Sequence, residues 1–338
     1  MAGYSYPGRN MWVAIGIQTS MTTLAQVYTF LQPTEVGGFF EEYATIESNR
    51  RLGTRFSGAP YPGTKTVPFS FTAEVDPAGL GRILLAALGT EYTAPSVTSV
   101  VHNHTFRLAE ELPYCTILGY LAGVADTTST VQSIRLRGAK IGQMTIRGGI
   151  DEVMTVAIEG MAMTASACSQ ITTAFSLEDP LFLNATLGTG TLSIGSAITA
   201  PALFEEAREF ELVINNNLSP DHRIHGSNSP VGIEEQSSEV TGSITALLNP
   251  ETMVEVRNFA AGNDRAITLT ATAAKFAYSV PTTYASLTIA LNKARYSGAT
   301  PSFDPDVMTL ELPFKAEISV STYVALRNNK SLPYSSAV

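Results

Sequence analysis

Histidine and carboxylate side chains are the groups through which this chain could hold a metal ion. The tripeptide His102-Asn103-His104 is similar to a nuclease signature, and its H-x-H spacing can place two metal ligands on one strand. A zinc site needs three or four ligands, and no cluster of Asp, Glu, His or Cys surrounds the tripeptide in sequence. His222 and His225 lie in a polar stretch, where solvated histidines are typical. The sequence therefore favours no metal site and no cofactor.

Acid–base and nucleophilic catalysis are not indicated either. No G-x-S-x-G motif occurs in the chain. The pairs Asp304 with Asp306 and Glu205 with Glu206 could act as acid and base, but solvated acidic turns are a commoner use of such pairs. The sequence therefore predicts that the protein is not an enzyme.

The two cysteines, Cys115 and Cys168, do not define a disulfide framework, because both lie in the first half of the chain. Neither has a histidine beside it in sequence, although proximity in the fold stays open. We expect both to be buried thiols. The first ten residues lack a basic and then apolar signal pattern, and no run of 18 apolar residues occurs, so we expect synthesis in a cytoplasm, with no export and no membrane span.

Charge and composition indicate a self-assembling protein. Charged residues make up only 15% of the chain, which leaves much of its surface uncharged or buried against neighbours. The net charge of −9 divides into −2 for residues 1–175 and −7 for residues 176–338. Stable nucleic-acid binding through phosphate neutralisation is therefore not expected.

The elements that organise the chain occur twice. Val67–Gly89 returns in similar form 173 positions later as Val240–Gly262, with seven of 23 positions identical. In both segments alternate residues are apolar or small, which predicts a half-buried strand. Ile134, Leu136 and Ala139 also match Ile289, Leu291 and Ala294, and Val153–Thr155 matches Val307–Thr309. We interpret this order as an internal duplication; the alternative is that any two strand–helix–strand units look alike.

A helix follows the strand in each repeat. Asp76-Pro77 and Asn249-Pro250 each supply an N-cap acceptor and a proline at the first helical position. Gly89 and Gly262 suit left-handed C-terminal caps. The predicted apolar faces are Leu80, Ile83, Leu84, Ala87 and Leu88 in the first helix, and Met253, Val256 and Ala260 in the second.

The sequence predicts a mainly β protein with two tandem β-sandwich or barrel domains, each with one flanking α-helix. The first covers residues 1–175 with an N-terminal arm, and the second covers residues 176–338 with a linker at 176–204 and a C-terminal arm. Met308–Val320 alternates as a strand, and Pro313 marks an edge or bulge in it.

Residues 33–66 form a long loop or extended hairpin whose composition is typical of a contact surface. Its aromatic and basic residues are Phe39, Phe40, Tyr43, Tyr61, Arg50, Arg51 and Arg55. Residues 215–239, which carry His222 and His225, form a second polar loop.

The chain resembles the tail tube proteins of long-tailed bacteriophages over nearly all of its length. The resemblance is carried by the GIQTSMTT segment at Gly16–Thr23, by Phe71–Gly89 with its V-D-P-x-x-L pattern, and by Arg107–Gly123. The second repeat has Asn249 where the first has an aspartate, which preserves the cap.

This resemblance implies a virion protein whose copies form rings around a channel. Because the chain is duplicated, three copies would form a pseudo-hexameric ring, and the two long loops would reach the next ring. The implied partners are the tape-measure protein, the tail terminator and the baseplate or tip proteins, with double-stranded DNA passing through without specific binding. An acidic channel surface would repel phosphates. The alternative is a virion β-sandwich adhesin that forms no tube.

Overall fold

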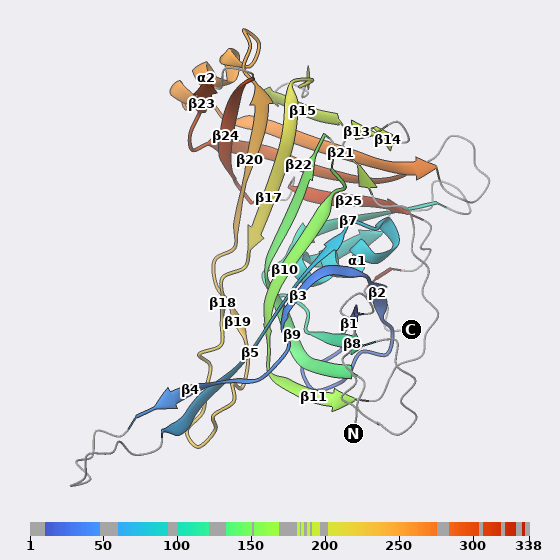
Figure 1. The fold of residues 1–338 in the computed structure, drawn as a ribbon, viewed down its shortest axis with the longest axis vertical. Coiled ribbons are helices and arrows are strands. Elements are labelled where there is room, and N and C mark those ends of the chain that lie inside the picture. The colour runs from blue at the N-terminus through green and yellow to red at the C-terminus, as the bar shows by residue number, and fades with distance from the viewer. Residues whose placement is uncertain are drawn as a thin grey trace, which may run out of the picture.

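The computed structural model describes residues 11–47, 60–93, 101–121, 133–150, 152–168, 181–182, 184–185, 188–189, 191–196, 202–275, 284–303, 307–318, 322–328 and 333–334. The protein is mainly β, with antiparallel sheets and two short helices among these residues (Figure 1). The mainly β class expected from the sequence is confirmed.

One long antiparallel sheet runs through both halves of the chain. Its first half contains β3 (Pro33–Gly38), β5 (Tyr61–Glu74), β10 (Thr155–Ala162) and β9 (Ser133–Gly149), paired in that order. Its second half contains β17 (Ala207–Asn215), β20 (Glu239–Leu247), β24 (Met308–Ala316) and β23 (Thr300–Phe303). Strands β9 and β17 pair with each other and join the two halves.

Second sheets cover the apolar face of this long sheet. The second sheet of the first half has the strand order β2 (Thr29–Leu31), β1 (Met11–Ile17), β8 (Cys115–Leu121), the start of β9, and β11 (Thr164–Cys168). In the second half the order is β16 (Ala202–Leu203), β15 (Thr191–Ser196), β21 (Arg265–Lys275), β22 (Tyr284–Tyr296) and β25 (Tyr323–Asn328). Strands β21 and β22 cross β17 and β20 steeply in Figure 1, as in orthogonally packed sandwiches.

Equivalent strands of the two halves pair in the same register. Phe71 of β5 lies opposite Ile158 and Val36, and its repeat partner Ile244 lies opposite Leu312 and Phe210. Both β3 and β17 bulge at matching positions, between Pro33 and Glu35 and between Ala207 and Glu209. Strands β8 and β21 also bulge alike, between Cys115 and Ile117 and between Arg265 and Ile267.

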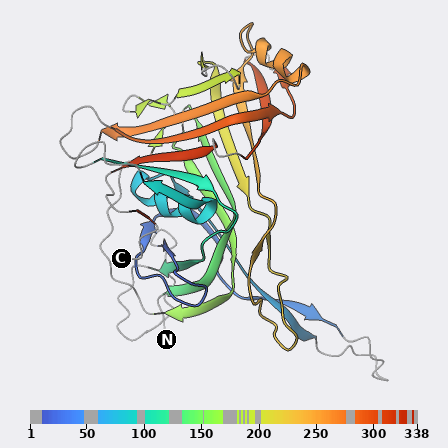
Figure 2. The same ribbon diagram turned by 180° about the vertical axis from the view of Figure 1, so that it is seen from behind.

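Helix α1 (Pro77–Leu88) begins and ends as the sequence predicts and lies between the halves (Figure 2). The amide of Leu80 donates to the carbonyl of Asp76 at 2.9 Å, and Gly89 has φ +94°. The helix contacts β1, β2 and β9 on one side and β22 and β25 on the other. Its side chains are apolar apart from Arg82, which donates to the Thr29 hydroxyl at 2.8 Å, and the described ones are buried.

Helix α2 (Met253–Ala260) differs from the expectation in both start and packing. Its N-cap is Thr252, because the Asn249 side-chain oxygen accepts the amides of Glu251 and Thr252 at 2.9 and 2.8 Å and holds Pro250 in a turn. Gly262 has φ +67°. The predicted apolar face was wrong at Met253 and Ala260, which are exposed, whereas Val256 packs against the core as predicted. The buried residue of the helix is Glu255.

Both expected arms contain strands of the second sheets. Strand β25, in the expected C-terminal arm, pairs with β22 and with β7 (His102–Leu108), and β7 pairs with β6 (Gly89–Thr93). The β6–β7 hairpin thus ties the first half to the second. Pro313 faces the break between β22 and β23, where its carbonyl accepts the Ser297 amide at 2.8 Å.

The remaining strands are short. They are β4 (Glu42–Ile46), β12 (Leu181–Phe182), β13 (Asn184–Ala185), β14 (Gly188–Thr189), β18 (Leu218–Ser219) and β19 (Glu234–Glu235). Of these, β12, β13 and β14 lie in the expected linker, and β12 pairs with β21, so this part of the linker is joined to the second sheet.

Candidate functional site

An extended hairpin leaves the body of the protein where β3 ends. Gly38 and Phe39 have φ values of +75° and +71°, which turn the chain away from β3 into β4. The left-handed conformation is costly for phenylalanine, but the Phe39 ring is buried and lies 6.3 Å from the Phe69 ring. Strand β4 pairs with the start of β5, and all five of its residues are exposed (Figure 1).

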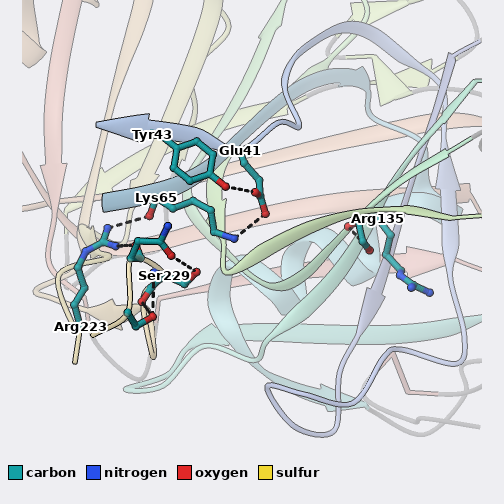
Figure 3. Close-up of polar contacts among 9 residues, drawn as sticks. Glu41, Tyr43, Lys65, Arg135, Arg223 and Ser229 are labelled. Atoms are coloured by element: carbon teal, nitrogen blue, oxygen red, sulfur yellow. Dashed lines mark hydrogen bonds and ion pairs between the residues drawn. The ribbon is translucent and has the colours of Figure 1, made fainter. Parts of the chain in front are cut away.

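A charged cluster fixes the base of this hairpin. The Glu41 carboxylate accepts hydrogen bonds from Lys65 Nζ at 2.7 Å and from the Tyr43 hydroxyl at 2.8 Å (Figure 3). The hydrogen bond from Lys65 is the main reason that the pKa of Glu41 is lowered. These three side chains hold the start of β4 against β5.

A loop from the second half braces the same point. Arg223 donates to the carbonyl of Asn228 at 2.7 Å and to the carbonyl of Lys65 at 3.1 Å. The Lys65 amide in turn donates to the Asn228 carbonyl at 2.8 Å (Figure 3). Residues far apart in the sequence thus form one projection at one end of the molecule, where Figure 1 shows β4 beside the β18–β19 loop.

The base of that loop is anchored by a largely buried ion pair. Lys140 Nζ lies 2.6 Å from Glu235 Oε1, which also accepts the Leu112 amide at 2.8 Å. Burial acts to raise the pKa of Glu235, but the hydrogen bonds from Lys140 and Leu112 outweigh it, so the pKa is lowered. Neither this pair nor Arg223 was singled out from the sequence, because only the fold brings their partners together.

The aromatic residues expected at contacts divide into two groups. Phe40, Tyr43 and Tyr61 are 66%, 47% and 62% exposed on the hairpin. Phe39 is 2% exposed, so its ring belongs to the core and the expectation of a contact role for it was wrong. Arg50, Arg51 and Arg55 lie outside the described residues.

The histidines also occupy different environments. His222 is exposed on the loop and its Nδ1 lies 2.9 Å from Glu234 Oε1, and His225 is exposed in a turn. His104 is fully buried, with Nδ1 2.8 Å from the Glu91 carboxylate. In the described ranges no three His, Cys, Asp or Glu side chains are close enough together to hold a metal ion.

The outer face of the long sheet is acidic. The register places on this face the side chains that alternate with the core residues. At its paired positions and strand ends the carboxylates are Glu35, Glu74, Glu159, Glu209, Glu211, Glu239 and Glu311, and the basic residues are Lys140, Arg147 and Lys315. Of the three, Lys140 is buried and paired with Glu235. Such a surface repels phosphate groups.

Comparison with known families gave one informative match. The family model of the phage tail tube protein matches residues 8–316. The chain belongs to the phage tail tube protein family. No curated protein matched the chain in a sequence search.

A tail tube protein is a structural component of the virion tail, where it assembles into a tube with other tail components. The family is structural rather than enzymatic. Within the described ranges neither helix of this tail tube protein has the length and apolar character needed to cross a bilayer.

Proposed function

We propose that this tail tube protein consists of two copies of one wall domain, residues 1–175 and 176–338, and that three chains close a pseudo-hexameric ring. The matching registers and bulges of the two halves support the duplication. The β9–β17 joint is the observation that carries the proposal, because it shows that one half continues the sheet of the other. Three chains would repeat this joint around a ring.

The long sheet also has two edges available for closing such a ring. Among the described residues, β3 pairs only with β5 and β23 only with β24. Exposed strand edges present unpaired backbone groups, and closing a sheet into a barrel removes them. Symmetric self-association is the common way in which soluble proteins cover such edges.

In this arrangement the acidic outer face of the long sheet lines the channel. The channel encloses the tape-measure protein during assembly and conducts double-stranded DNA at infection. Because carboxylates outnumber basic residues on this face, the lining repels the DNA phosphates, and the genome passes without specific binding. The virion protein is made in the cytoplasm of the bacterial host.

The projection formed by the hairpin and the β18–β19 loop contacts the adjacent ring. Its exposed Phe40, Tyr43 and Tyr61 are residue types that are enriched at protein interfaces. The exposed His222 and His225 lie on the same projection, and Arg50, Arg51 and Arg55 belong to the same hairpin in sequence. The rings at the two tube ends meet the tail terminator and the baseplate or tip proteins.

Electron microscopy of the purified protein tests the proposal. We expect tubes or three-fold rings with a central channel. Replacing residues 45–60 by a two-glycine turn, together with Phe40→Ser and Tyr61→Ser, removes Arg50, Arg51, Arg55 and two of the three exposed aromatic side chains. It leaves Glu41, Tyr43 and Lys65 in place, and we expect rings that no longer stack. Monodisperse monomers that bind glycans would support the adhesin instead, and normal stacking of the shortened protein would refute the contact role of the hairpin.

A further inference from the structure

We infer that β23 of one copy pairs with β3 of the next copy in the register of the β9–β17 joint. The inference rests on the proposed ring and specifies its contact residue by residue. It follows from the correspondence of strands between the two halves. Strand β9 pairs with β10 in the first half, and β22 and β23 together pair with β24 in the same way in the second. Likewise β17 occupies the place of β3.

The internal joint fixes which residues meet. Arg147 lies opposite Thr155 on β10, and Ser302 lies opposite Thr309 on β24, so Ser302 corresponds to Arg147. Gly37 lies opposite Ser70, and Glu211 lies opposite Ser243, so Gly37 corresponds to Glu211. Arg147 faces Glu211 across the joint. Ser302 of one copy therefore faces the partner copy's Gly37.

The neighbouring pair of the joint explains an exposed aromatic side chain. Gly148 faces Phe210 within the chain, so Phe303 faces Val36 between chains. Phe303 is 72% exposed, whereas Val36 packs against the core. Cross-strand partners point to the same face of a sheet. Pairing therefore brings the Phe303 ring against the apolar layer of the next copy and removes it from water.

The backbone groups at both edges agree with this register. The Ile150 amide donates to Arg208 and the Asn216 amide to Gly142, so even-numbered residues of β9 and β17 carry the bonds of the internal joint. By correspondence, the backbone groups that point away from the sheet at its two edges are those of Phe303 and Pro301 on β23 and of Val36 and Gly38 on β3. Pro301 lacks an amide hydrogen, so this joint has one hydrogen bond fewer. The same lack makes the free edge of β23 less able to pair with other strands before assembly.

Helix α2 lies beside the same joint. Within the chain α1 lies between the halves, with the Pro77 carbonyl accepting a hydrogen bond from Asn328 at 2.8 Å. Helix α2 corresponds to α1, and no described element gives it an equivalent cover, since Met253 and Val254 are 44% and 43% exposed. The strands that correspond to β22 and β25 are β9 and β11. In the ring, β9 and β11 of the next copy cover α2.

Disulfide trapping in assembled protein tests the register. The variant S302C/G37C is made with Cys168→Ser to remove the partly exposed thiol and with Ser70→Ala, because a Cβ on Gly37 would lie 2.7 Å from the Ser70 hydroxyl. The control S302C/E35C, in the same background, pairs Ser302 with the diagonal neighbour of Gly37 instead. The two cysteines then lie roughly 7–8 Å apart across the strands. That separation is beyond disulfide reach. After electron microscopy has shown assemblies, mild oxidation and a non-reducing gel measure cross-linking.

We expect linked dimers and trimers, with no larger species, at about ten times the yield of the control. Assemblies in which S302C/G37C cross-links no more than the control would overturn the register and leave the tube function standing. A parent protein that forms no rings or tubes would overturn the proposed function itself, and this inference with it. If the S302C/G37C protein fails to assemble while the parent protein assembles, V36C/F303C in the Cys168→Ser background tests the adjacent pair. Assembled V36C/F303C protein that cross-links no more than the control would also count against the register.

Discussion

Arg147 of β9 and Glu211 of β17 lie directly opposite each other where the two halves of the long sheet meet, with 4.0 Å between Arg147 Nε and Glu211 Oε2. Both side chains are solvent-accessible, and exposed ion pairs contribute little to stability. On the other face of the same joint Ile146 lies opposite Leu212, and both are buried. The joint is therefore held by backbone hydrogen bonds and apolar packing.

Leu212→Ala is expected to lower the free energy of unfolding by about 2–5 kcal/mol, because it leaves a cavity behind the joint. Arg147→Ala is the matched control on the opposite face and is expected to cost less than about 1 kcal/mol. Urea denaturation followed by circular dichroism measures both. A larger effect of Arg147→Ala than of Leu212→Ala would show that charge holds the joint.

Tyr334 fixes the C-terminal segment to α1. A Cβ at Gly81 would lie 2.1 Å from the Tyr334 ring, so only glycine permits this approach. The Asn328 side chain also donates to the Tyr334 hydroxyl at 2.6 Å. We expect Tyr334→Ala to cost about 3–5 kcal/mol by analogy with other buried aromatics, and Tyr334→Phe about 1 kcal/mol for the lost hydrogen bond. Equal losses in the two variants, measured by thermal unfolding, would contradict a packing role for the ring.

Glu235→Gln is expected to lower the free energy of unfolding at pH 7 by about 1–3 kcal/mol, because the nearly buried Lys140 ammonium loses its charged partner. The folded-state pKa of Glu235 is lowered from its ordinary 4.5, so the carboxylate stabilises the fold above that value. This contribution is lost as the pH falls through the folded-state pKa. Urea titrations should therefore show the difference between wild type and variant narrowing at acidic pH; a difference that stays constant would argue against the ion pair.

The two thiols should react at very different rates. Cys115 is fully buried and its pKa is raised to about 12, mainly by burial, so it holds little reactive thiolate at neutral pH. Cys168 is only partly buried, contrary to the expectation from sequence, although burial raises its pKa too. A maleimide should label one site in the folded protein and two in denaturant. Labelling of Cys115 at the rate of Cys168 would show that the first half opens readily.

Local signals in the sequence were sufficient where neighbouring residues decide the structure. The proline and capping positions around Asp76 predicted α1, and alternation predicted the position of β5 and most of β24. The two matched segments also indicated which strands correspond, and the pairing of Glu74 with Thr155 and of Leu247 with Thr309 follows that correspondence.

Tertiary contacts decided what the sequence could not. The backbone hydrogen bonds that join β7 to β25 leave no trace in side-chain patterns, so the C-terminal strand was expected to be an arm. Helix α2 departs from its repeat partner because the Arg265 guanidinium and the Tyr296 hydroxyl draw Glu255 inward, with Arg265 Nη2 2.7 Å from Glu255 Oε1. Phe39 is buried because the backbone is left-handed at Gly38 and at Phe39 itself.

The β6–β7 hairpin has a consequence for symmetry matching at the tube ends. It belongs to the first half alone and pairs with β25, so the two wall segments of one chain are not interchangeable. The same is true of the β4 projection. In the proposed ring of three chains two kinds of segment would alternate, and a component that caps such a tube would meet a three-fold arrangement of features rather than six identical ones. Its docking surface would then recognise every second position.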